Sequence, residues 1–305
     1  MPSEAPDLSR LQPVLPSPLQ PVDDERFARH GVRLLLKRDD LIHPDLPGNK
    51  WRKLSPNLRA AAGRTVLTFG GAYSNHLRAT AAAGRLLGFP TVGVVRGEEL
   101  ADRPLNPSLA RCAADGMTLH FMDRATYRAK DGPEVLAGLR RLFGECCVVP
   151  EGGSNALAAQ GCAELGRELR GRAATVAVAC GTGGTLAGLA AGLAPGQRAL
   201  GVPVLRGGFL GDAVRGLQEE AFGGPAGAWS LDERFHFGGY ARTTPALHAF
   251  ADDFERRHGL PVERLYVAKL LYALTELAGE GAFPAGSAVA AVVTGSPQGA
   301  SDSSR

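Results

Sequence analysis

The sequence predicts an α/β fold of open, mostly parallel sheets with helices on both faces. Short apolar runs rich in β-branched residues alternate along the chain with segments in which Ala, Leu and Arg follow a helical period. Most of these apolar runs lack polar alternation, which is typical of parallel strands buried on both faces. Three junctions that follow such runs are rich in glycine and small polar residues, and open α/β sheets bind their ligands at junctions of this kind.

The apolar runs and the segments of helical period also predict the positions of the individual strands and helices. The apolar runs predict strands, in chain order, at Val32–Leu36, Thr65–Phe69, Thr91–Val95, Met117–Phe121, Cys146–Val149, Thr175–Ala179, Ala199–Val204 and Ala288–Val293. The segments of helical period predict helices at Arg52–Ala62, Asn75–Leu87, Pro107–Asp115, Glu134–Leu142, Ala156–Arg170, Thr185–Gly192, Asp212–Ala221, Pro245–His258 and Ala268–Ala278. The first 21 residues are proline-rich and are expected to run extended over the surface.

The length of 305 residues suggests about two domains, or one large α/β unit. No linker marks a boundary, and the sequence contains no internal repeat. A second domain is therefore expected as an insertion within the first, not as a tandem fusion.

Composition and charge exclude several classes of protein. Hydrophobic residues make up 44% of the chain and charged residues 21%, which are ordinary values for a globular protein. The net charge of +3 gives no reason to expect a nucleic-acid partner. No run approaches the roughly 18 apolar residues of a membrane span, and the N-terminus lacks the basic and apolar regions of a signal peptide.

The cysteines indicate a reducing compartment. Their number is odd and they contain no C-x-x-C pair, so they fit reduced thiols in a cytoplasmic protein better than a disulfide framework. They are Cys112, Cys146, Cys147, Cys162 and Cys180.

Lysine is scarce, and this narrows the search for a reactive amine. Only five of the 34 basic residues are lysine, namely Lys37, Lys50, Lys53, Lys130 and Lys269. A compositional bias toward arginine is the simple explanation. Any chemistry that needs a titratable amine nevertheless has only these five candidates.

The first junction joins the strand near Val176 to the segment Gly181-Thr182-Gly183-Gly184-Thr185 and then a helix. Consecutive glycines let backbone N–H groups converge, and the helix N-terminus adds positive charge, so the segment predicts a phosphate site. It matches neither the Walker A pattern nor G-x-G-x-x-G, because Leu186 stands where the third glycine belongs. A plain tight turn for close strand–helix packing is the alternative.

The second junction runs from Gly70 to His76 and leads into a helix. Ser74 or Asn75 is a good N-cap residue, and capping alone is one explanation. The functional interpretation is a loop that presents Ser74, Asn75 and backbone donors to an anionic substrate.

The third junction places Lys50 between a Gly-Asn turn and the start of a helix. The helix N-terminus and the neighbours Arg52 and Lys53 favour the neutral amine, so the pKa of Lys50 is expected to fall toward the nucleophilic range. A solvated lysine at a helix start is the alternative.

No pattern predicts a metal site. His43 and Asp45 fit a turn, and His236, His248 and His258 lack the spacing of known metal ligands. Asp39 and Asp40 are expected to pin the loop before Lys50.

Together, these motifs resemble a known family. The segments Gly48–Leu54, Gly70–His76 and Gly181–Thr185 occur in the order and approximate spacing of the 1-aminocyclopropane-1-carboxylate deaminase/D-cysteine desulfhydrase family. The likeness also covers Pro150–Asn155 and Phe235–Tyr240, and extends from about Pro16 to Gly299. It implies a tryptophan synthase β-like (fold-type II) enzyme that uses pyridoxal 5′-phosphate, with a homodimer as the expected assembly.

The resemblance implies a role for each matching residue. Lys50 resembles the Schiff-base lysine, Lys53 the lysine at the cofactor phosphate, and Ser74 the residue that moves a proton or binds the substrate carboxylate. The implied catalytic residues are Lys50, Ser74 and Tyr266. The implied cofactor-binding residues are Lys50, Lys53, Asn75, Gly181, Thr182, Gly183, Gly184, Thr185, Tyr240 and Thr294, with Asn75 at the phenolic oxygen and Thr294 at the pyridine nitrogen. The implied substrate-binding residues are Ser74, Asn75, His76, Tyr240 and Tyr266.

Two departures from the family pattern concern the pocket. Val267 follows Tyr266 where the deaminases have glutamate, and the desulfhydrase-like members usually have Thr-Gly where this chain has Val267 and Ala268 before Lys269. Ser296 stands where the usual Thr-Gly-Gly has its second glycine. The loss of the glutamate predicts a poor 1-aminocyclopropane-1-carboxylate deaminase, because Val267 can neither accept a proton nor accept a hydrogen bond through its side chain.

These observations lead to one expected function and two alternatives. The expected reaction is α,β-elimination from D-cysteine or a relative, which gives pyruvate, ammonia and sulfide. The alternatives are the deaminase and a non-catalytic protein that binds a phosphorylated ligand or the cofactor. We expect a large cofactor-binding domain of residues 1–53 and 163–305, with a small inserted domain of residues 54–162.

Overall fold

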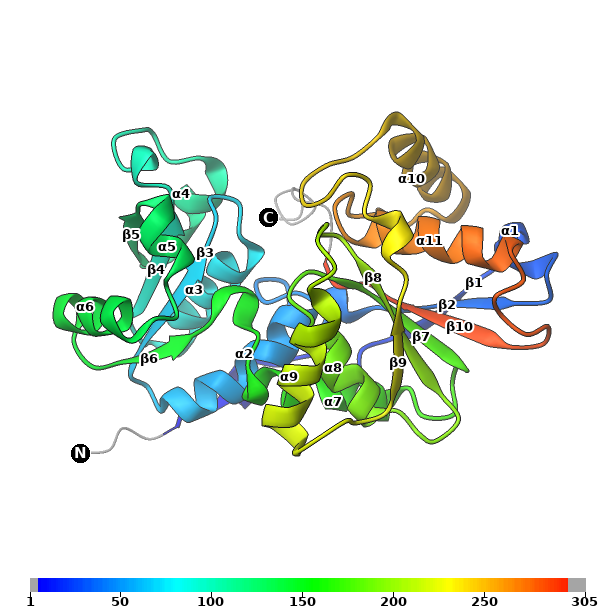
Figure 1. The fold of residues 1–305 in the computed structure, drawn as a ribbon, viewed down its shortest axis with the longest axis horizontal. Helices are drawn as coiled ribbons and strands as arrows, with labels where there is room; N and C mark the ends of the chain where they lie inside the picture. The colour runs from blue at the N-terminus through cyan, green and yellow to red at the C-terminus, as the bar shows by residue number, and fades with distance from the viewer. Residues whose placement is uncertain (1–4, 296–305) are drawn as a thin grey trace.

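The computed structural model describes residues 5–295, so Ser296 lies outside the described residues. The chain forms two separate sheets with helices on the faces of each (Figure 1). The α/β fold class with mostly parallel sheets is therefore confirmed. None of the helices in residues 5–295 has both the length and the apolar character of a membrane-spanning segment.

The larger sheet has six strands in the order β1-β2-β10-β7-β8-β9. Only β1 and β2 pair antiparallel, and every other neighbouring pair is parallel. The strands are β1 (Leu19–Val22), β2 (Arg33–Lys37), β7 (Thr175–Cys180), β8 (Arg198–Pro203), β9 (Ala228–Leu231) and β10 (Ala288–Val292).

The smaller sheet has four parallel strands in the order β5-β4-β3-β6. They are contiguous in the chain and lie between β2 and β7, namely β3 (Thr65–Gly70), β4 (Thr91–Arg96), β5 (Thr118–Met122) and β6 (Cys146–Val149). An insertion of one sheet into the other explains why no linker sequence separates them.

Helices connect the strands. The α-helices are α1 (Glu25–Ala28), α2 (Asn49–Ala61), α3 (Asn75–Leu87), α4 (Pro107–Ala114), α5 (Arg124–Arg128), α6 (Pro133–Phe143), α7 (Ala156–Glu168), α8 (Gly184–Gly192), α9 (Leu210–Phe222), α10 (Pro245–His258) and α11 (Val267–Gly279). Short 3₁₀ turns are η1 (Leu8–Leu11), η2 (Asp39–Leu41), η3 (Glu98–Leu100), η4 (Glu151–Gly153) and η5 (Glu233–Phe235).

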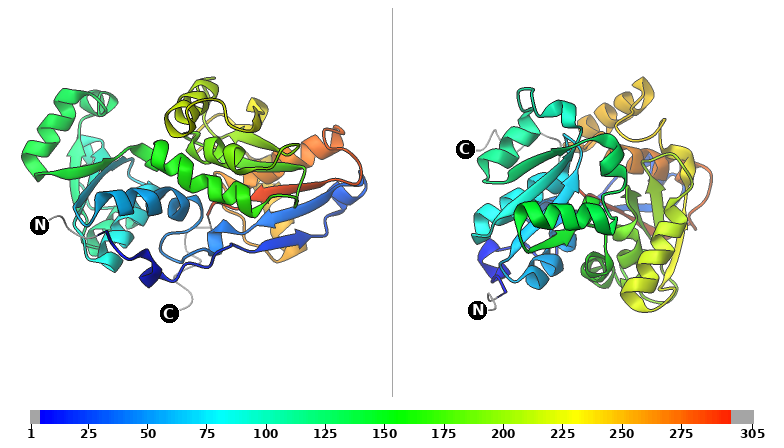
Figure 2. Two further views of the ribbon diagram at one scale, coloured as in Figure 1. Left: turned by 90° about the horizontal axis from the view of Figure 1, so that it is seen from below. Right: turned by 60° about the vertical axis from the view of Figure 1, so that its left-hand side comes forward.

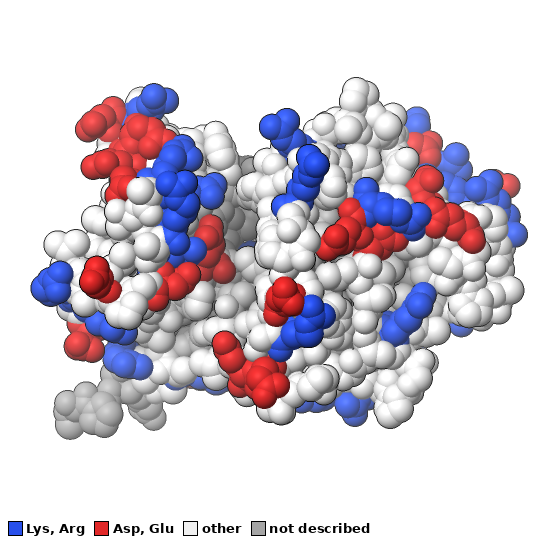
Figure 3. Space-filling model, viewed as in Figure 1, with Lys and Arg blue, Asp and Glu red and all other residues white. Residues whose placement is uncertain are grey.

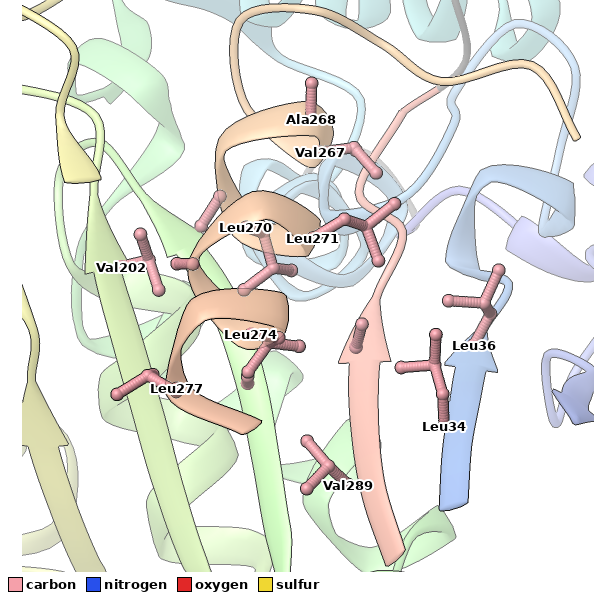
Figure 4. Packing of buried hydrophobic residues seen from close by; sticks show 14 of the residues in the cluster. Leu34, Leu36, Val202, Val267, Ala268, Leu270, Leu271, Leu274, Leu277 and Val289 are labelled. Carbon is pink, nitrogen blue, oxygen red and sulfur yellow. The ribbon is translucent and has the colours of Figure 1, made fainter. Parts of the chain in front are cut away.

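The larger sheet is buried on both faces, as its unbroken apolar strands predict. In β7, Val176 and Val178 pack in a cluster with α7, α8 and α9, whereas Ala177 and Ala179 pack with α10 and α11. Figure 4 shows Val267 and other residues of α11 lying over β10 and β2.

Most predicted elements are present within a few residues of their predicted ends. Four elements were not predicted from the sequence, namely the strands β1 and β9 and the helices α1 and α5. Both missed strands lie at sheet edges and are only partly buried, so they lack the unbroken apolar run of a central strand. β1 also contains Pro21, which an edge strand tolerates.

Two helices pack against each other between the sheets. Figure 2 shows α7 beside α2 in the middle of the molecule. The boundaries expected at residues 53/54 and 162/163 fall inside α2 and α7. The domain division at those positions remains a proposal.

α7 also packs against α8 through glycines. A Cβ at Gly188 of α8 would lie 2.1 Å from the carbonyl oxygen of Ala159, and one at Gly192 would lie 2.0 Å from that of Ala163. Only glycine allows the two backbones to approach so closely at these positions.

A buried network of charges fixes α2 to the larger sheet. Arg52 of α2 binds both carboxylate oxygens of Asp39 at 2.7 Å and both of Glu168 at 3.0 Å. Lys37 at the end of β2 binds Glu168 at 2.6 Å, and Ser17 donates to Asp39 at 2.6 Å. Asp39, as expected, also pins the loop before Lys50, because its backbone oxygen accepts from the Gly48 N–H.

The first prediction concerns this network. Arg52→Met should lower the free energy of unfolding by about 3–5 kcal/mol, because Asp39 would stay buried without its counter-charge. Arg215→Met is the matched control, since Arg215 pairs with Asp212 on the surface of α9 and should cost less than about 1 kcal/mol. Urea unfolding followed by circular dichroism measures both, and equal losses would contradict a structural role for the network.

Candidate active site

A cavity lies at the carboxyl end of β7, between the starts of α2 and α8. Figure 3 shows a hollow between the two lobes of the molecule, with basic side chains on both of its sides. The cavity is lined by Asn49, Lys50, Lys53, Gly152, Ala179, Cys180, Gly181, Thr182, Gly183, Thr185, Leu186 and Tyr266. The structure therefore brings together most of the residues predicted at the first and third junctions.

The glycine segment after β7 forms an anion cradle. Gly183 is the N-cap of α8 with a φ of 83°, which favours glycine, and no side chain caps this helix end. The first turn of α8 contains no acidic residue, so its positive end is uncompensated. A Cβ at Gly184 would lie 2.8 Å from Ser154 Oγ, and therefore a larger residue would fill the cradle.

Lys50 lies in the first turn of α2, because the helix begins at Asn49 and not at Arg52 as predicted. Its Nζ donates to Asn49 Oδ1 at 2.8 Å, and Asn49 in turn donates to Thr185 Oγ1 at 3.1 Å. Gly48 has a φ of 64°, and a Cβ there would lie 1.9 Å from the carbonyl oxygen of Thr294. This contact places Thr294 directly beside the turn that leads to Lys50.

Lys53 lies one turn further along α2 and reaches the other side of the cradle. Its Nζ donates to Ser154 Oγ at 2.8 Å, to the Gly152 carbonyl at 3.2 Å and to Thr182 Oγ1 at 3.5 Å. Within residues 5–295, neither Lys50 nor Lys53 forms an ion pair with a carboxylate. Two lysines and an open helix N-terminus therefore face a site that suits an anion.

The electrostatics of the cavity favour a neutral amine at Lys50. Burial, followed by the positive charge of Lys53, lowers the pKa of Lys50 to about 7. Burial also lowers the pKa of Lys53. The prediction that Arg52 contributes is wrong, because Asp39 and Glu168 hold its guanidinium and neutralise its charge.

The second junction lies on the smaller sheet. Ser74 is the N-cap of α3, and its Oγ accepts from the Leu77 N–H at 3.3 Å, as the capping interpretation predicts. Asn75 begins the helix and is exposed. Neither residue lines the cavity described above, so their roles toward a substrate remain a proposal.

His76 points into the protein instead of lining the cavity. Its Nε2 lies 2.7 Å from Thr68 Oγ1, and Thr68 donates its proton to the Val149 carbonyl, so His76 must be the donor in their contact. The Nδ1 atom is buried without a hydrogen-bond partner in the described residues. Burial, together with Lys50 and Lys53, holds the pKa of His76 well below its usual range, so the ring is neutral.

The two predicted tyrosines meet at the edge of the cavity. Tyr266 lines it, and a Cβ at Gly181 would lie 3.5 Å from the Tyr266 phenolic oxygen. Tyr240 packs edge-on against Tyr266 with ring centroids 6.4 Å apart, and its own ring is partly exposed. Burial raises the pKa of both phenols, so both are protonated.

Three residues near the site were not predicted from the sequence. Asn49 accepts a hydrogen bond from Lys50, and Ser154 accepts one from Lys53. Both lie in motifs that were recognised, so a polar side chain within a motif was the sequence feature that could have identified them. Arg96 ends β4, and its Nη2 lies 3.6 Å from the position of a Cβ on Gly71 in the loop before Ser74. A charge at the end of a predicted buried strand was the signal there.

Other candidate chemistries are not supported. Cys180 lines the cavity, but burial raises the pKa of its thiol to about 12, so it is no thiolate nucleophile. His43 Nδ1 accepts from the backbone of Asp45 and Leu46, which confirms the turn. No metal-binding cluster of His, Cys, Asp and Glu occurs between residues 5 and 295.

A nucleophilic amine beside an anion cradle defines a class of enzyme. Residues 11–295 match the family model described as pyridoxal-phosphate dependent enzyme, and the chain belongs to this family. The site fits the cofactor pyridoxal 5′-phosphate, because Lys50 can react with its aldehyde while Lys53 and the α8 N-terminus suit its phosphate.

The chain is also similar to individual members of this family. The chain is 30% identical over 280 residues to a protein of Pyrococcus furiosus provisionally named 1-aminocyclopropane-1-carboxylate deaminase, with 82% of this chain and 81% of that protein covered. It is 34% identical over 198 residues to D-cysteine desulfhydrase of Yersinia pestis, with 58% of each covered. A crystal structure of an ACC deaminase homologue superposes with a TM-score of 0.79 at 26% identity, covering 94% of both chains.

The second prediction uses the low pKa of Lys50. Without cofactor, the folded chain loses this proton near pH 7, whereas the unfolded chain keeps it up to about 10.5. Between pH 7 and about 10.5 the unfolded state therefore binds more protons than the folded state, so the titration of Lys50 makes the free energy of unfolding rise with pH. Lys50→Met has no amine to bury, so its free energy of unfolding should exceed that of the wild type at pH 7.

The difference in free energy of unfolding between Lys50→Met and the wild type, here called the margin, should narrow toward pH 9 by at most about 1.4 kcal/mol per pH unit. Urea unfolding of the cofactor-free proteins at pH 7, 8 and 9 measures it. Lys130→Met controls for the loss of a lysine as such, since Lys130 pairs with Asp131 and Glu151 outside the cavity. A margin that stays constant would contradict a neutral amine at Lys50.

Proposed function

We propose that this protein is a pyridoxal phosphate-dependent lyase that carries out α,β-elimination on D-cysteine or a close relative. The products would be pyruvate, ammonia and sulfide, with one water consumed. The observation that carries the proposal is a lysine of pKa about 7 beside an anion cradle that contains a second lysine. The similarity to a D-cysteine desulfhydrase supports the choice of substrate.

Some of the proposed cofactor-binding residues line the cavity, namely Lys50, Lys53, Gly181, Thr182, Gly183 and Thr185. Lys50 would hold the cofactor covalently, while Lys53 and the backbone of Gly181–Thr185 would bind its phosphate. Asn75, Tyr240 and Thr294 would contact its ring. Thr294 would offer the ring nitrogen a neutral hydroxyl, which cannot hold a proton there as a carboxylate does.

When bound, the cofactor supplies the electron withdrawal that weakens the bonds at Cα of the amino acid. The protein residues orient the substrate and move the proton. Lys50, once free of the cofactor, would take the Cα proton, because burial lowers the pKa of its amine to about 7, in the range of a general base. Ser74 at the positive end of α3 would bind the substrate carboxylate or relay that proton.

Tyr266 and Tyr240 would close the substrate side of the cavity. Both phenols keep their protons, so each can donate a hydrogen bond to a substrate or to a leaving thiolate. Asn75 and His76 complete the proposed substrate-binding set, His76 acting from beneath the loop as a neutral ring.

The second candidate activity is 1-aminocyclopropane-1-carboxylate deamination, which the names of relatives favour. The position after Tyr266 argues against it in this chain. Val267 is buried in the core between α11 and the larger sheet, so its side chain offers nothing to the cofactor. Opening the cyclopropane ring requires strong stabilisation of charge, and a missing charge-assisted hydrogen bond of about 1.5–3 kcal/mol would slow it roughly ten- to a hundred-fold.

The third prediction compares the two activities. Purified protein loaded with cofactor should form pyruvate and ammonia from D-cysteine with a higher kcat/KM than it forms α-ketobutyrate from 1-aminocyclopropane-1-carboxylate. Assays with L-cysteine test which enantiomer the protein accepts. Assays with β-chloro-D-alanine and D-serine test which β leaving groups it can eliminate. The opposite ranking of the two main substrates would overturn the proposal. No turnover of any of them would favour the non-catalytic alternative.

Loading is tested separately from turnover. The protein should be yellow, and borohydride reduction should fix the cofactor to the peptide that contains Lys50. Lys50→Ala should be colourless after the same treatment. A wild type that stays colourless with added cofactor would exclude Lys50 from the proposed role.

The fourth prediction concerns Ser74. Ser74→Ala should retain bound cofactor but lose kcat by roughly 10²–10⁴-fold, the range for removal of a proton-transfer group. The variant also loses the α3 cap, so Asp123→Ala, which removes the cap of α5 next to the edge strand β5, is its control. Asp123→Ala should lose stability and keep activity, whereas full activity in Ser74→Ala would refute the assigned role.

We also propose a homodimer in the cytoplasm. The free cysteines support a reducing compartment, and four of the five are buried. Light scattering of the purified protein tests the dimer.

A further inference from the structure

One lysine outside the cavity is buried without a counter-charge. Lys269 lies in α11 and is fully buried, and it forms no ion pair with any described residue. Its Nζ donates instead to two backbone carbonyls of one loop, those of His236 and Gly239, both at 2.9 Å. Burial of a lone charge is unfavourable, so a lysine kept at this position needs an explanation.

The acidic group whose charge acts on Lys269 does not bond to this amine. Glu263 carries the charge that acts on Lys269, but its two oxygens accept from the backbone N–H groups of Leu265, Tyr266 and Val267. Burial consequently lowers the pKa of Lys269 to about 8. The two loop carbonyls are the groups that stabilise the amine.

The loop that Lys269 holds has an unusual backbone. Four of its residues have φ in the left-handed region, namely Phe237 at 53°, Gly238 at 90°, Gly239 at 115° and Ala241 at 56°. Phe237 and Ala241 are not glycines, so this conformation is strained and persists only where the surroundings fix it. The ring of Phe237 packs on Tyr272, and His236 Nδ1 accepts from the Gly238 N–H.

The loop also carries Tyr240, which lies between the strained residues. Tyr240 packs against Tyr266, the N-cap residue of α11, and Lys269 lies three residues further along that helix. The start of α11 therefore positions both rings, Tyr266 through the chain itself and Tyr240 through the amine of Lys269.

We propose that Lys269 is a positioning residue that fixes the loop of residues 235–241 so that Tyr240 stays against Tyr266 at the cavity. The proposal rests on the proposed function, because it assumes that Tyr240 contacts the substrate. Lys269 itself does not line the cavity and takes no part in the chemistry. The expected effect of its loss is weaker substrate binding and not loss of cofactor.

The first arm of the test needs no activity. Lys269→Met keeps the length and apolar stem of the side chain but removes the donor. Hydrogen exchange of the cofactor-free protein should become at least roughly tenfold faster in residues 236–241, because opening is less costly without the two bonds. If Lys269→Met does not fold, the hydrogen-exchange measurement uses Lys269→Gln, whose side chain keeps a donor but is shorter.

Gln197 offers a matched control. It is a buried side chain that donates to two backbone carbonyls, those of Leu169 and Ala173, in the turn before β8 and away from the cavity. Gln197→Met should lower the unfolding temperature and leave exchange in residues 236–241 unchanged. Exchange in this loop that is unchanged in the Lys269 variant, or equally faster in both variants, would overturn the proposal.

The second arm measures kinetics with D-cysteine. Lys269→Met should raise KM roughly tenfold with a smaller change in kcat, while Gln197→Met should change neither. Tyr240→Phe combined with Lys269→Met should raise KM no further than the worse single variant, because both act through one ring. Additive effects of the two substitutions on KM, or faster hydrogen exchange in Lys269→Met with an unchanged KM, would overturn the positioning role of Lys269. If no amino acid is turned over, the proposed function fails while the exchange arm still decides the role of Lys269 in holding the loop.

Discussion

The salt bridges of Arg52 are the interaction on which the site depends. Arg52 lies between Lys50 and Lys53 in the sequence, but in a helix the two lysines share one face and the arginine points to another. Asp39 and Glu168 hold Arg52 in the protein, and the same contacts turn both lysines toward the cradle at α8. One helix thus carries a guanidinium paired with carboxylates on one side and two amines without a carboxylate partner on the other. The orientation of the Lys50 amine follows from the arginine, which does not line the cavity.

The contrast in charge pairing explains the chemistry of the cavity. The carboxylates of Asp39 and Glu168 keep Arg52 charged despite its burial, and Glu168 also pairs with Lys37, so both basic residues act as structural groups. Lys50 and Lys53 lack such partners, and burial shifts both toward the neutral amine. The same logic separates Cys180, whose buried thiol stays protonated, from a nucleophile. A reactive lysine in this protein is therefore one that the structure leaves unpaired, and an anionic ligand would supply the missing charge.

Much of this could be predicted from sequence because the informative segments are local. The run before Gly181, the glycines after it and the cap at Ser74 each specify a strand end or a helix start within a few residues. Features that depend on distant residues were missed. The edge strands β1 and β9 form only because β2 and β8 lie beside them, and Arg52 was taken for a neighbour of Lys50 because Asp39 and Glu168 are not visible in the motif. The burial of His76 and the role of Lys269 likewise depend on contacts across the fold.

The glycine contact between α7 and α8 has a mechanical consequence. Backbones that approach within a few ångströms at Gly188 and Gly192 leave no room to slide, so the two helices move as one rigid body. Asn155 at the start of α7 exchanges two hydrogen bonds with Asn57, which joins α2 to the same body. The amine of Lys50 and the cradle at Gly183 consequently keep a fixed separation. The loop of Ser74, which follows β3 of the smaller sheet, lies outside this group of packed helices.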